Sequence, residues 1–240
     1  MDGAGDVALN VVFMGPPGAG KGTQAERFAR EHGIPKISTG DILREAVAGG
    51  TPLGQKAKAV MDRGDLVGDD LIVPIVRDRL AQPDAARGFV LDGFPRTVPQ
   101  ANALDEMLLD RGPIIVVEIQ VPDDELVRRV VSRRICSNCG RTVSAFGDGA
   151  VTERCANCGG PLVSRSDDSE TVVRDRLKVY WRETLPMIAF YHARPTYRAV
   201  DGAQPPEKVH DALVAQIASV LGKPAGELKR VSERRPESNA

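Results

Sequence analysis

The chain has 240 residues, 42% hydrophobic and 27% charged, which is ordinary for a globular protein with a full core. Its 32 lysines and arginines nearly balance 33 aspartates and glutamates, so no overall basic field favours nucleic acid or an anionic membrane as partner. Residues 1–6 lack the order of a signal peptide, and no apolar run is long enough to span a bilayer, so we expect a cytoplasmic protein.

Short apolar runs alternate with helical patterns along the chain. In order, the patterns predict a strand at 7–13, a helix at 21–31, a strand at 34–37, and helices at 39–48, 52–63 and 69–81. They continue with a strand at 89–91, a helix at 99–110, a strand at 114–121, helices at 123–134 and 170–192, a strand at 197–200 and a helix at 206–221. Strands separated by helices favour parallel pairing, and their continuous apolar character indicates a sheet covered on both faces. The predicted fold is α/β, a doubly wound sheet of five parallel strands.

Two regions interrupt this alternation. Residues 135–164 are rich in Gly, Cys, Asn and Ser, and lie between two helical patterns, which favours a small inserted lobe. Residues 222–240 have almost no apolar content and many charges, so we expect a disordered tail.

A glycine-rich run follows the first strand and precedes the first helix. Its residues are Gly15-Pro16-Pro17-Gly18-Ala19-Gly20-Lys21-Gly22-Thr23. Glycines at this spacing let backbone N–H groups surround phosphate oxygens at the start of a helix, and Lys21 can neutralise charge on the transferred group. The alternative is an ordinary glycine-rich turn. The position usually held by a Mg²⁺-binding hydroxyl is Gly22, so Asp92, at the end of a buried strand, is the better candidate to hold magnesium through water.

Four cysteines form two CxxC pairs separated by 15 residues, namely Cys136, Cys139, Cys155 and Cys158. Four thiolates fill a tetrahedral zinc shell and leave no open position, so the predicted site is structural. Disulfides are the alternative, but they are rare in a reducing compartment. A nucleic-acid-binding zinc ribbon is disfavoured because the insert and its border offer few cations and one aromatic residue, Arg141, Arg154, Arg165 and Phe146.

Three strings of residues together indicate a family. Residues 37–41 (ISTGD), 92–96 (DGFPR) and 20–24 (GKGTQ) resemble those of nucleoside monophosphate kinases, and their order most resembles long-lid adenylate kinases of the bacterial type. The resemblance extends from about residue 7 to 221. It implies reversible, Mg²⁺-dependent phosphoryl transfer from ATP to AMP by a monomer, giving two ADP, with a structural zinc in a lid that closes over the site. It also implies a core at 1–38, 69–134 and 165–221, an AMP-binding region at 39–68 and the lid at 135–164.

The resemblance assigns roles to individual residues. Transfer would depend on Lys21, Arg96, Arg133, Arg165 and Arg176. ATP would contact Gly18, Ala19, Gly20, Lys21, Gly22, Thr23, Arg129, Arg133, Thr142, Val143 and Gln204. AMP would contact Thr39, Arg44, Asp65, Leu66, Val67, Gly93, Phe94, Pro95, Arg96, Gln100, Arg165 and Arg176. No general base is expected, because the attacking phosphate oxygen of AMP is already an anion.

Each assignment has a simpler alternative. The arginines could be solvated partners in ion pairs, although Arg129 and Arg133 lie one turn apart on the predicted helix. Asp167 and Asp168 could cap the helix that follows them. The three histidines are expected at the surface or in packing, and Tyr180, Trp181, Phe190 and Tyr191 on the core face of the long helix. A kinase for UMP or CMP, a GTP-dependent kinase, and a nucleotide-binding module without turnover are the rival functions.

Overall fold

The computed structural model describes residues 8–144, 153–165 and 167–228. Its main sheet has five parallel strands. Their spatial order is β2 (Lys36–Ser38), β3 (Gly88–Asp92), β1 (Leu9–Met14), β4 (Ile114–Gln120) and β8 (Tyr197–Asp201). The predicted α/β class and the parallel five-stranded sheet are confirmed.

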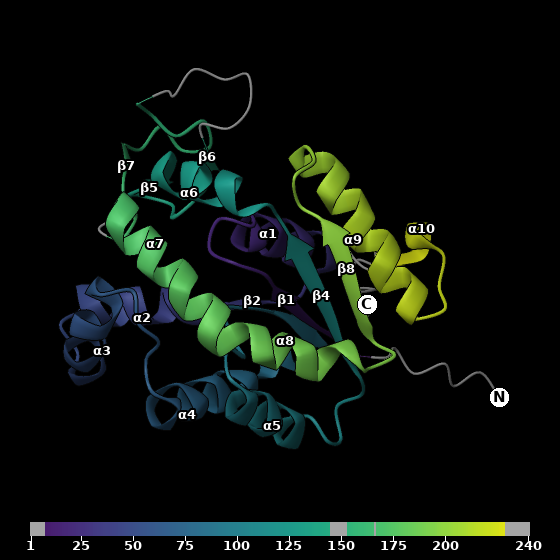
Figure 1. Cartoon of the computed structure of the whole chain (residues 1–240). Helices are drawn as coiled ribbons and strands as arrows, with labels where there is room; N and C mark the ends of the chain where they lie inside the picture. The colour runs from purple at the N-terminus through teal and green to yellow at the C-terminus, as the bar shows by residue number, and fades with distance from the viewer. Residues whose placement is uncertain (1–7, 145–152, 166, 229–240) are drawn as a thin grey trace, which may run out of the picture.

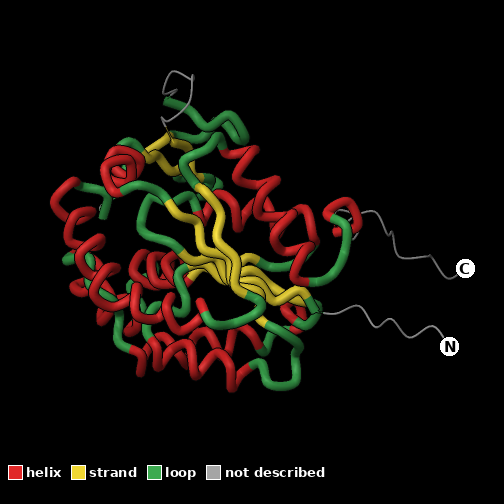
Figure 2. Tube along the Cα trace, turned by 45° about the vertical axis from the view of Figure 1, so that its right-hand side comes forward, coloured by secondary structure: helices red, strands yellow, loops and turns green. Residues whose placement is uncertain are grey.

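Helices cover both faces of this sheet, which Figure 2 shows as a central layer of strands between helices. Alternate residues of β1 point to opposite faces, so Val11 and Phe13 join one buried cluster while Val12 and Met14 join the other. The first cluster includes side chains of α1 (Lys21–His32), α6 (Asp123–Val131), α7 (Glu170–Val179) and α9 (Pro206–Val220). The second includes side chains of α2 (Thr39–Ala48), α3 (Pro52–Asp62), α4 (Asp69–Leu80), α5 (Val98–Met107) and α8 (Leu185–His192). These helices agree with the sequence patterns within a few residues, and a short 3₁₀ turn, Pro83–Ala85, was not predicted.

The predicted helix at 123–134 is too long at its C-terminal end. Helix α6 ends at Val131, and Arg133 begins strand β5 (Arg133–Cys136). This strand lies between β6 (Thr142–Ser144) and β7 (Leu162–Val163) in a small antiparallel sheet, the lobe at the top of Figure 1. Arg129 and Arg133 are therefore not neighbours on one helix, because pairing with distant strands overrides the local helical pattern.

The predicted long helix at 170–192 is interrupted. Between α7 and α8 the chain forms a π-helical turn, Tyr180–Thr184, in which the Leu185 N–H donates to the Tyr180 carbonyl. Pro186 follows directly and has no N–H to continue the regular ladder. Tyr180 and Tyr191 are buried and Phe190 is partly buried as predicted, but Trp181 is 40% exposed, so its predicted core position is wrong.

The expected disordered tail is partly ordered. Residues Ala225–Leu228 form helix α10, and the Leu228 side chain is buried in the first cluster. One leucine among polar residues gives no periodic signal, so only packing against α9 identifies this turn. The remaining residues of the expected tail, 229–240, lie outside the described residues.

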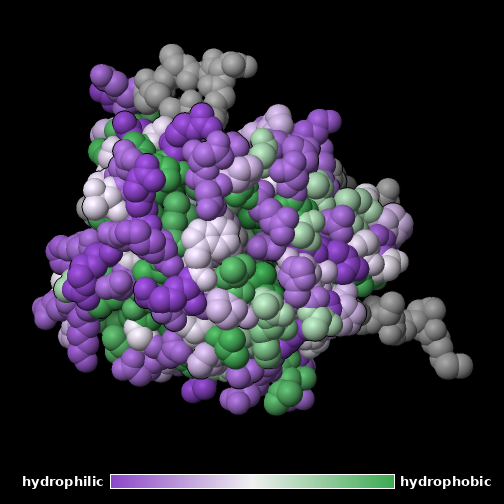
Figure 3. Space-filling view, in the orientation of Figure 1, coloured by the Kyte–Doolittle hydropathy of each residue, from purple (hydrophilic) through white to green (hydrophobic). Residues whose placement is uncertain are grey.

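No helix among the described residues is both long and apolar enough to cross a membrane. The face seen in Figure 3 is mainly hydrophilic, with hydrophobic side chains in small separate patches. Of the histidines, His32 and His210 are buried and His192 is exposed, in agreement with packing and surface positions.

Candidate active site and metal centre

The predicted site residues of the main sheet meet at the carboxyl ends of its strands. Phe13 and Ser38 are both in register with Asp92, so the loop after β1, the start of α2 and the end of β3 lie side by side. In open parallel sheets this edge is where ligands bind. The register therefore brings the end of β3 beside two segments that lie more than fifty residues earlier in the sequence.

The loop between β1 and α1 has the geometry of a phosphate cradle. Gly15 has φ of 137°, a region that favours glycine, and a Cβ there would lie 2.4 Å from the Ile119 carbonyl oxygen. Helix α1 begins after Gly20 without a side-chain cap, so no capping side chain takes up the N–H groups of its first turn. A Cβ on Gly22 would lie 3.3 Å from Asp92 Oδ2, which puts this carboxylate directly beside the cradle. Thr23 is exposed.

Lys21 folds back over the loop. Its Nζ donates to the carbonyl oxygens of Gly15 at 2.7 Å and Pro16 at 2.9 Å. Burial lowers the pKa of Lys21 to about 8; Asp92 opposes this shift, and nearby guanidinium groups add to it. An anion placed next to such a buried ammonium group stabilises its charged form, because it replaces part of the lost hydration.

Two adjoining cavities open at this edge of the sheet. Both are lined by Gly64, Leu66, Gly93, Arg96 and Arg176. The first also contacts Lys21 and Pro95, and we name it the cradle cavity. The second contacts several predicted AMP residues, and we name it the acceptor cavity: Thr39, Arg44, Asp65, Val67 and Gln100. Phe94 is instead buried in the core at 1% exposure.

Arginines from four separate segments converge on three aspartates beside these cavities. Arg176 Nη1 lies 3.0 Å from Asp167 Oδ2 and 3.6 Å from Asp168 Oδ1. Arg133 Nε donates to Asp168 Oδ2 at 2.7 Å. The remaining links join Arg44 to Asp41 at 2.6 Å and to Asp167 at 4.0 Å, and Arg165 to Asp41 at 3.9 Å.

The aspartates of this network have a role that sequence reasoning missed. Helix α7 begins after Ser169 without a side-chain cap, so Asp167 and Asp168 do not cap it but hold arginines. Although burial opposes the shift, Arg176 and Arg44 lower the pKa of Asp167, and Lys36 and Arg44 hold that of Asp41 far below its usual range. The sequence offered one signal for this role: several arginines were predicted at one site, and buried arginines need carboxylate partners.

Positive charge remains in excess. Four cations line the two cavities, Lys21, Arg44, Arg96 and Arg176, against two carboxylates, Asp65 and Asp167. The edge pair of Lys36 and Glu26 adds one charge of each sign. Burial lowers the pKa of Arg165 and Arg176 to about 10, and the buried Nε of Arg165 finds no acceptor among the described residues. These features fit polyanionic ligands.

Four of the predicted ATP contacts, Arg129 and the three residues expected around the ATP base, lie apart from the two cavities. Arg129 donates from Nε to Glu125 at 2.8 Å and from Nη1 to the Gly202 carbonyl at 2.9 Å. Gln204 is exposed and bonds to Asp201, while Thr142 and Val143 lie on β6 in the small lobe. None of these four lines either cavity as described. The structure therefore brings together most of the predicted AMP and phosphate residues, but neither Arg129 nor the residues predicted around the ATP base.

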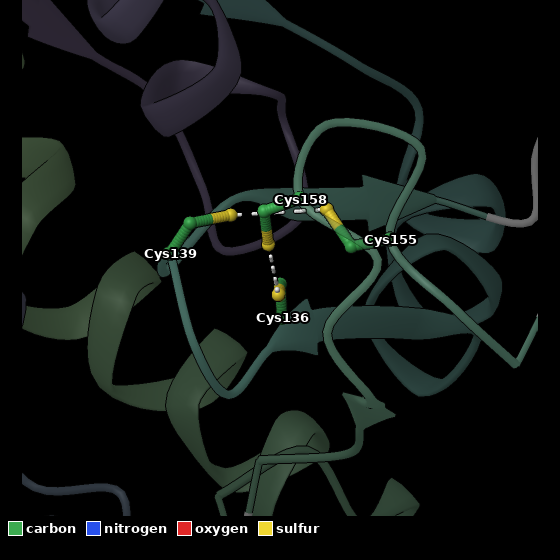
Figure 4. Close-up of side chains that lie close together, drawn as sticks. All are labelled: Cys136, Cys139, Cys155 and Cys158. Atoms are coloured by element: carbon green, nitrogen blue, oxygen red, sulfur yellow. Dashed lines mark hydrogen bonds between the residues drawn. The ribbon is translucent and has the colours of Figure 1, made fainter.

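The four cysteines of the small lobe form one cluster, drawn in Figure 4. Their sulfur atoms all lie within 4.8 Å of one another, with Cys136–Cys158 at 3.4 Å and Cys139–Cys155 at 3.7 Å. Thiolates about 2.3 Å from a tetrahedral Zn²⁺ are about 3.8 Å apart, so the cluster fits this ion. Each CxxC closes a tight turn, in which the N–H of Gly140 or Gly159 donates to the first cysteine's carbonyl. A backbone N–H from Arg141 lowers the pKa of Cys139, whereas the neighbouring thiols raise the pKa of Cys158 although a backbone N–H from Gly160 opposes that shift.

Comparison with known proteins agrees with this geometry. The family model described as adenylate kinase matches residues 13–196. The chain is 47% identical over 215 residues to an adenylate kinase of Archaeoglobus fulgidus, covering 88% of this chain and 99% of that protein. It is 51% identical over 204 residues to one of Symbiobacterium thermophilum (84% and 94% covered), and 49% identical over 217 residues to one of a Geobacillus strain (89% and 99% covered).

Proposed function

The chain belongs to the adenylate kinase family and is a nucleoside monophosphate kinase that transfers phosphate between ATP and AMP; on this premise we propose how its residues do so. The observation that supports the proposal most is the cationic excess at the junction of the cradle and acceptor cavities. Two polyphosphate-bearing substrates repel each other, and cations on both sides of the reacting group offset that repulsion.

In the proposed reaction, a phosphate oxygen of AMP attacks the γ-phosphorus of ATP. The bond from this phosphorus to the β–γ bridging oxygen breaks, and both products are ADP. Lys21 and the N–H groups of its loop hold the ATP phosphates, while Arg44 and Arg96 hold the AMP phosphate. Arg133, Arg165 and Arg176 neutralise charge on the transferring group. The attacking oxygen is already ionised, so no residue needs to remove a proton.

The aspartates give this arrangement two states. In the first state, Asp41, Asp167 and Asp168 hold the arginines in ion pairs. Phosphate oxygens, with more charge and better bidentate geometry, compete for the same guanidinium groups when substrates bind. We propose that this exchange accompanies closure of a lid at residues 135–164 over the core, with residues 39–68 as the AMP-binding region. Thr142, Val143, Arg129 and Gln204 then contact ATP only in the closed form, which accounts for their distance from the cavities.

Two metal ions are part of the proposal. Asp92, beside the cradle, would hold the water shell of the Mg²⁺ that accompanies ATP, and that ion supplies charge neutralisation between the phosphates. The four cysteines would hold a structural zinc that stiffens a lobe too small for a core of its own. That the enzyme acts as a monomer in the cytoplasm stays a prediction.

A coupled assay of ADP production with each nucleoside monophosphate and with ATP or GTP tests this function. We expect AMP and ATP to give the highest kcat/KM. Lys21→Met should lower turnover by a factor of about 10³ in a folded protein, because one charge-stabilising donor is lost. A preference for UMP or CMP would contradict the proposed acceptor, and near-normal turnover of the variant would remove the cradle from the mechanism.

A further inference from the structure

One carboxylate, that of Asp69, joins the start of α4 to the start of α5. Its Oδ1 accepts from Gln100 Nε2 at 2.6 Å, and its Oδ2 accepts from Thr97 Oγ1 at 3.0 Å. At the other end of the same amide, Gln100 Oε1 accepts the backbone N–H of Arg96 at 2.8 Å. The Gln100 amide is therefore held by a partner at each end.

These two partners allow only one orientation of the amide. A carboxylate can only accept a hydrogen bond, and a backbone N–H can only donate one. Rotating the amide by half a turn would place its oxygen against Asp69 and its NH₂ against the Arg96 N–H. Both hydrogen bonds would become repulsive contacts. The two partners therefore determine which end of the amide is Nε2 and which is Oε1.

The rest of the Gln100 amide is available to a ligand. A primary amide has two N–H donors and two acceptor lone pairs, and the two bonds above use one of each. Gln100 is only 2% exposed and lines the acceptor cavity. One N–H and one lone pair therefore remain. Because buried amides normally satisfy their polar atoms, we expect a molecule in that cavity to bond to both.

A fixed amide discriminates between purines that a rotating amide would accept equally. A 6-aminopurine offers an N6–H donor beside the N1 acceptor, whereas a 6-oxopurine offers an O6 acceptor beside an N1–H donor. A glutamine free to rotate by half a turn satisfies either edge. A glutamine in one orientation satisfies one edge and places like groups against the other, provided that the phosphate holds the base in position.

We propose that Asp69 is a specificity-determining positioning residue: it fixes the Gln100 amide in the orientation that selects AMP over a 6-oxopurine monophosphate such as IMP. The inference rests on the proposed acceptor role of the cavity. It assigns Asp69 no contact with substrate and no effect on the donor side. Asp69 acts through Gln100. The other partner of this amide is the backbone N–H of Arg96, which a side-chain substitution would not remove.

The neighbouring residue provides a matched control. Asp70 lies in the same first turn of α4, where either carboxylate favours the helix dipole. Its side chain is exposed and does not bond to Gln100. Replacing Asp70 therefore reproduces the loss of charge at the helix start without releasing the amide.

The experiment measures kcat/KM for AMP and for IMP at saturating ATP, with the melting temperature of each variant. Asp69→Leu, branched at Cγ like aspartate but without acceptors, should reduce the AMP/IMP ratio about tenfold or more, through KM, and leave KM for ATP unchanged. Asp69→Asn keeps one acceptor oxygen but its amide can also donate, so it should give a ratio between those of the wild type and Asp69→Leu. Asp70→Leu should retain the wild-type ratio. In a Gln100→Leu background, Asp69→Leu should change the ratio no further.

A wild-type ratio in folded Asp69→Leu would overturn the inference, as would an equal further loss in the Gln100→Leu background. If Asp69→Leu fails to fold, Asp69→Ala takes its place in the same comparison. Dissociation constants for AMP and IMP, measured by calorimetry without ATP, give the ratio independently of turnover. A wild type that binds AMP but does not phosphorylate it would contradict the proposed function, while the binding ratios of the variants would still decide the role of Asp69.

Discussion

The proton on Lys21 offers a direct test of the phosphate cradle. Burial lowers its pKa from 10.5 to about 8, a difference that corresponds to about 3 kcal/mol of cost for holding the charge in the free enzyme. Phosphates next to Nζ should relieve that cost and raise the pKa again. At pH 8.5 about three quarters of free chains lack this proton, so ATP binding should take up about 0.8 proton per chain.

Calorimetry of ATP binding in buffers of different ionisation enthalpy measures this uptake. The phosphates of ATP have lost their protons well below this pH, since the last phosphate pKa is about 6, so they should contribute little. Lys21→Met is the matched control and should abolish the uptake. In steady state, kcat/KM for ATP should fall up to tenfold per pH unit above about 8, while kcat at saturating ATP should stay level over the same range.

Unfolding does not explain such a fall. The unfolded chain keeps this proton up to about pH 10.5, so between pH 8 and 10.5 it binds more protons than the folded chain, and this group then makes stability rise with pH. Proton uptake that is absent in the wild type, or equal in Lys21→Met, would refute the reasoning. A level kcat/KM up to pH 9.5 would do the same.

Three further predictions follow from the packing and the clusters. Thr39 Oγ1 donates to the Gly93 carbonyl at 2.9 Å, and both residues line the acceptor cavity. Thr39→Ala should therefore weaken discrimination against UMP and CMP by about tenfold in paired assays and spare ATP binding. An unchanged acceptor preference would show that another residue contacts the base. Cys139→Ser should reduce bound zinc from about one ion per chain and lower the melting temperature, while part of the activity remains at low temperature. A wild-type protein without zinc would contradict a structural zinc site, as would activity that follows the metal content of folded protein. Leu228→Ala should cost about 2 kcal/mol and lower the melting temperature by about 4–8 °C, whereas Leu109→Ala, at a side chain 80% exposed, should leave it unchanged; equal effects would mean that α10 adds no stability.

Much of the fold was predictable because its signals are local. The order of strands and helices follows from apolar runs and helical periods, and parallel pairing follows from their alternation. The errors fall where a distant partner decides the outcome. Arg133 continues a helical pattern in sequence, but pairing with β6 and β7 makes it part of a strand. Leu228 gives no signal alone, yet α9 provides a surface that buries it.

The residues that carry the chemistry of the site were predictable from short motifs. Glycine spacing before Lys21 predicts a phosphate loop, and the spacing of four cysteines predicts a cluster of thiols that could hold a metal ion, because each glycine-rich or CxxC motif is a short, local pattern. The partners of the arginines were decided only by tertiary structure, which joins Arg44 and Arg176 to Asp167 across the fold. The orientation of Gln100 is of the same kind, since it depends on Asp69, 31 residues away. Such pairings arise from the meeting of separate helices and strands, and no short-range pattern of residues encodes that meeting.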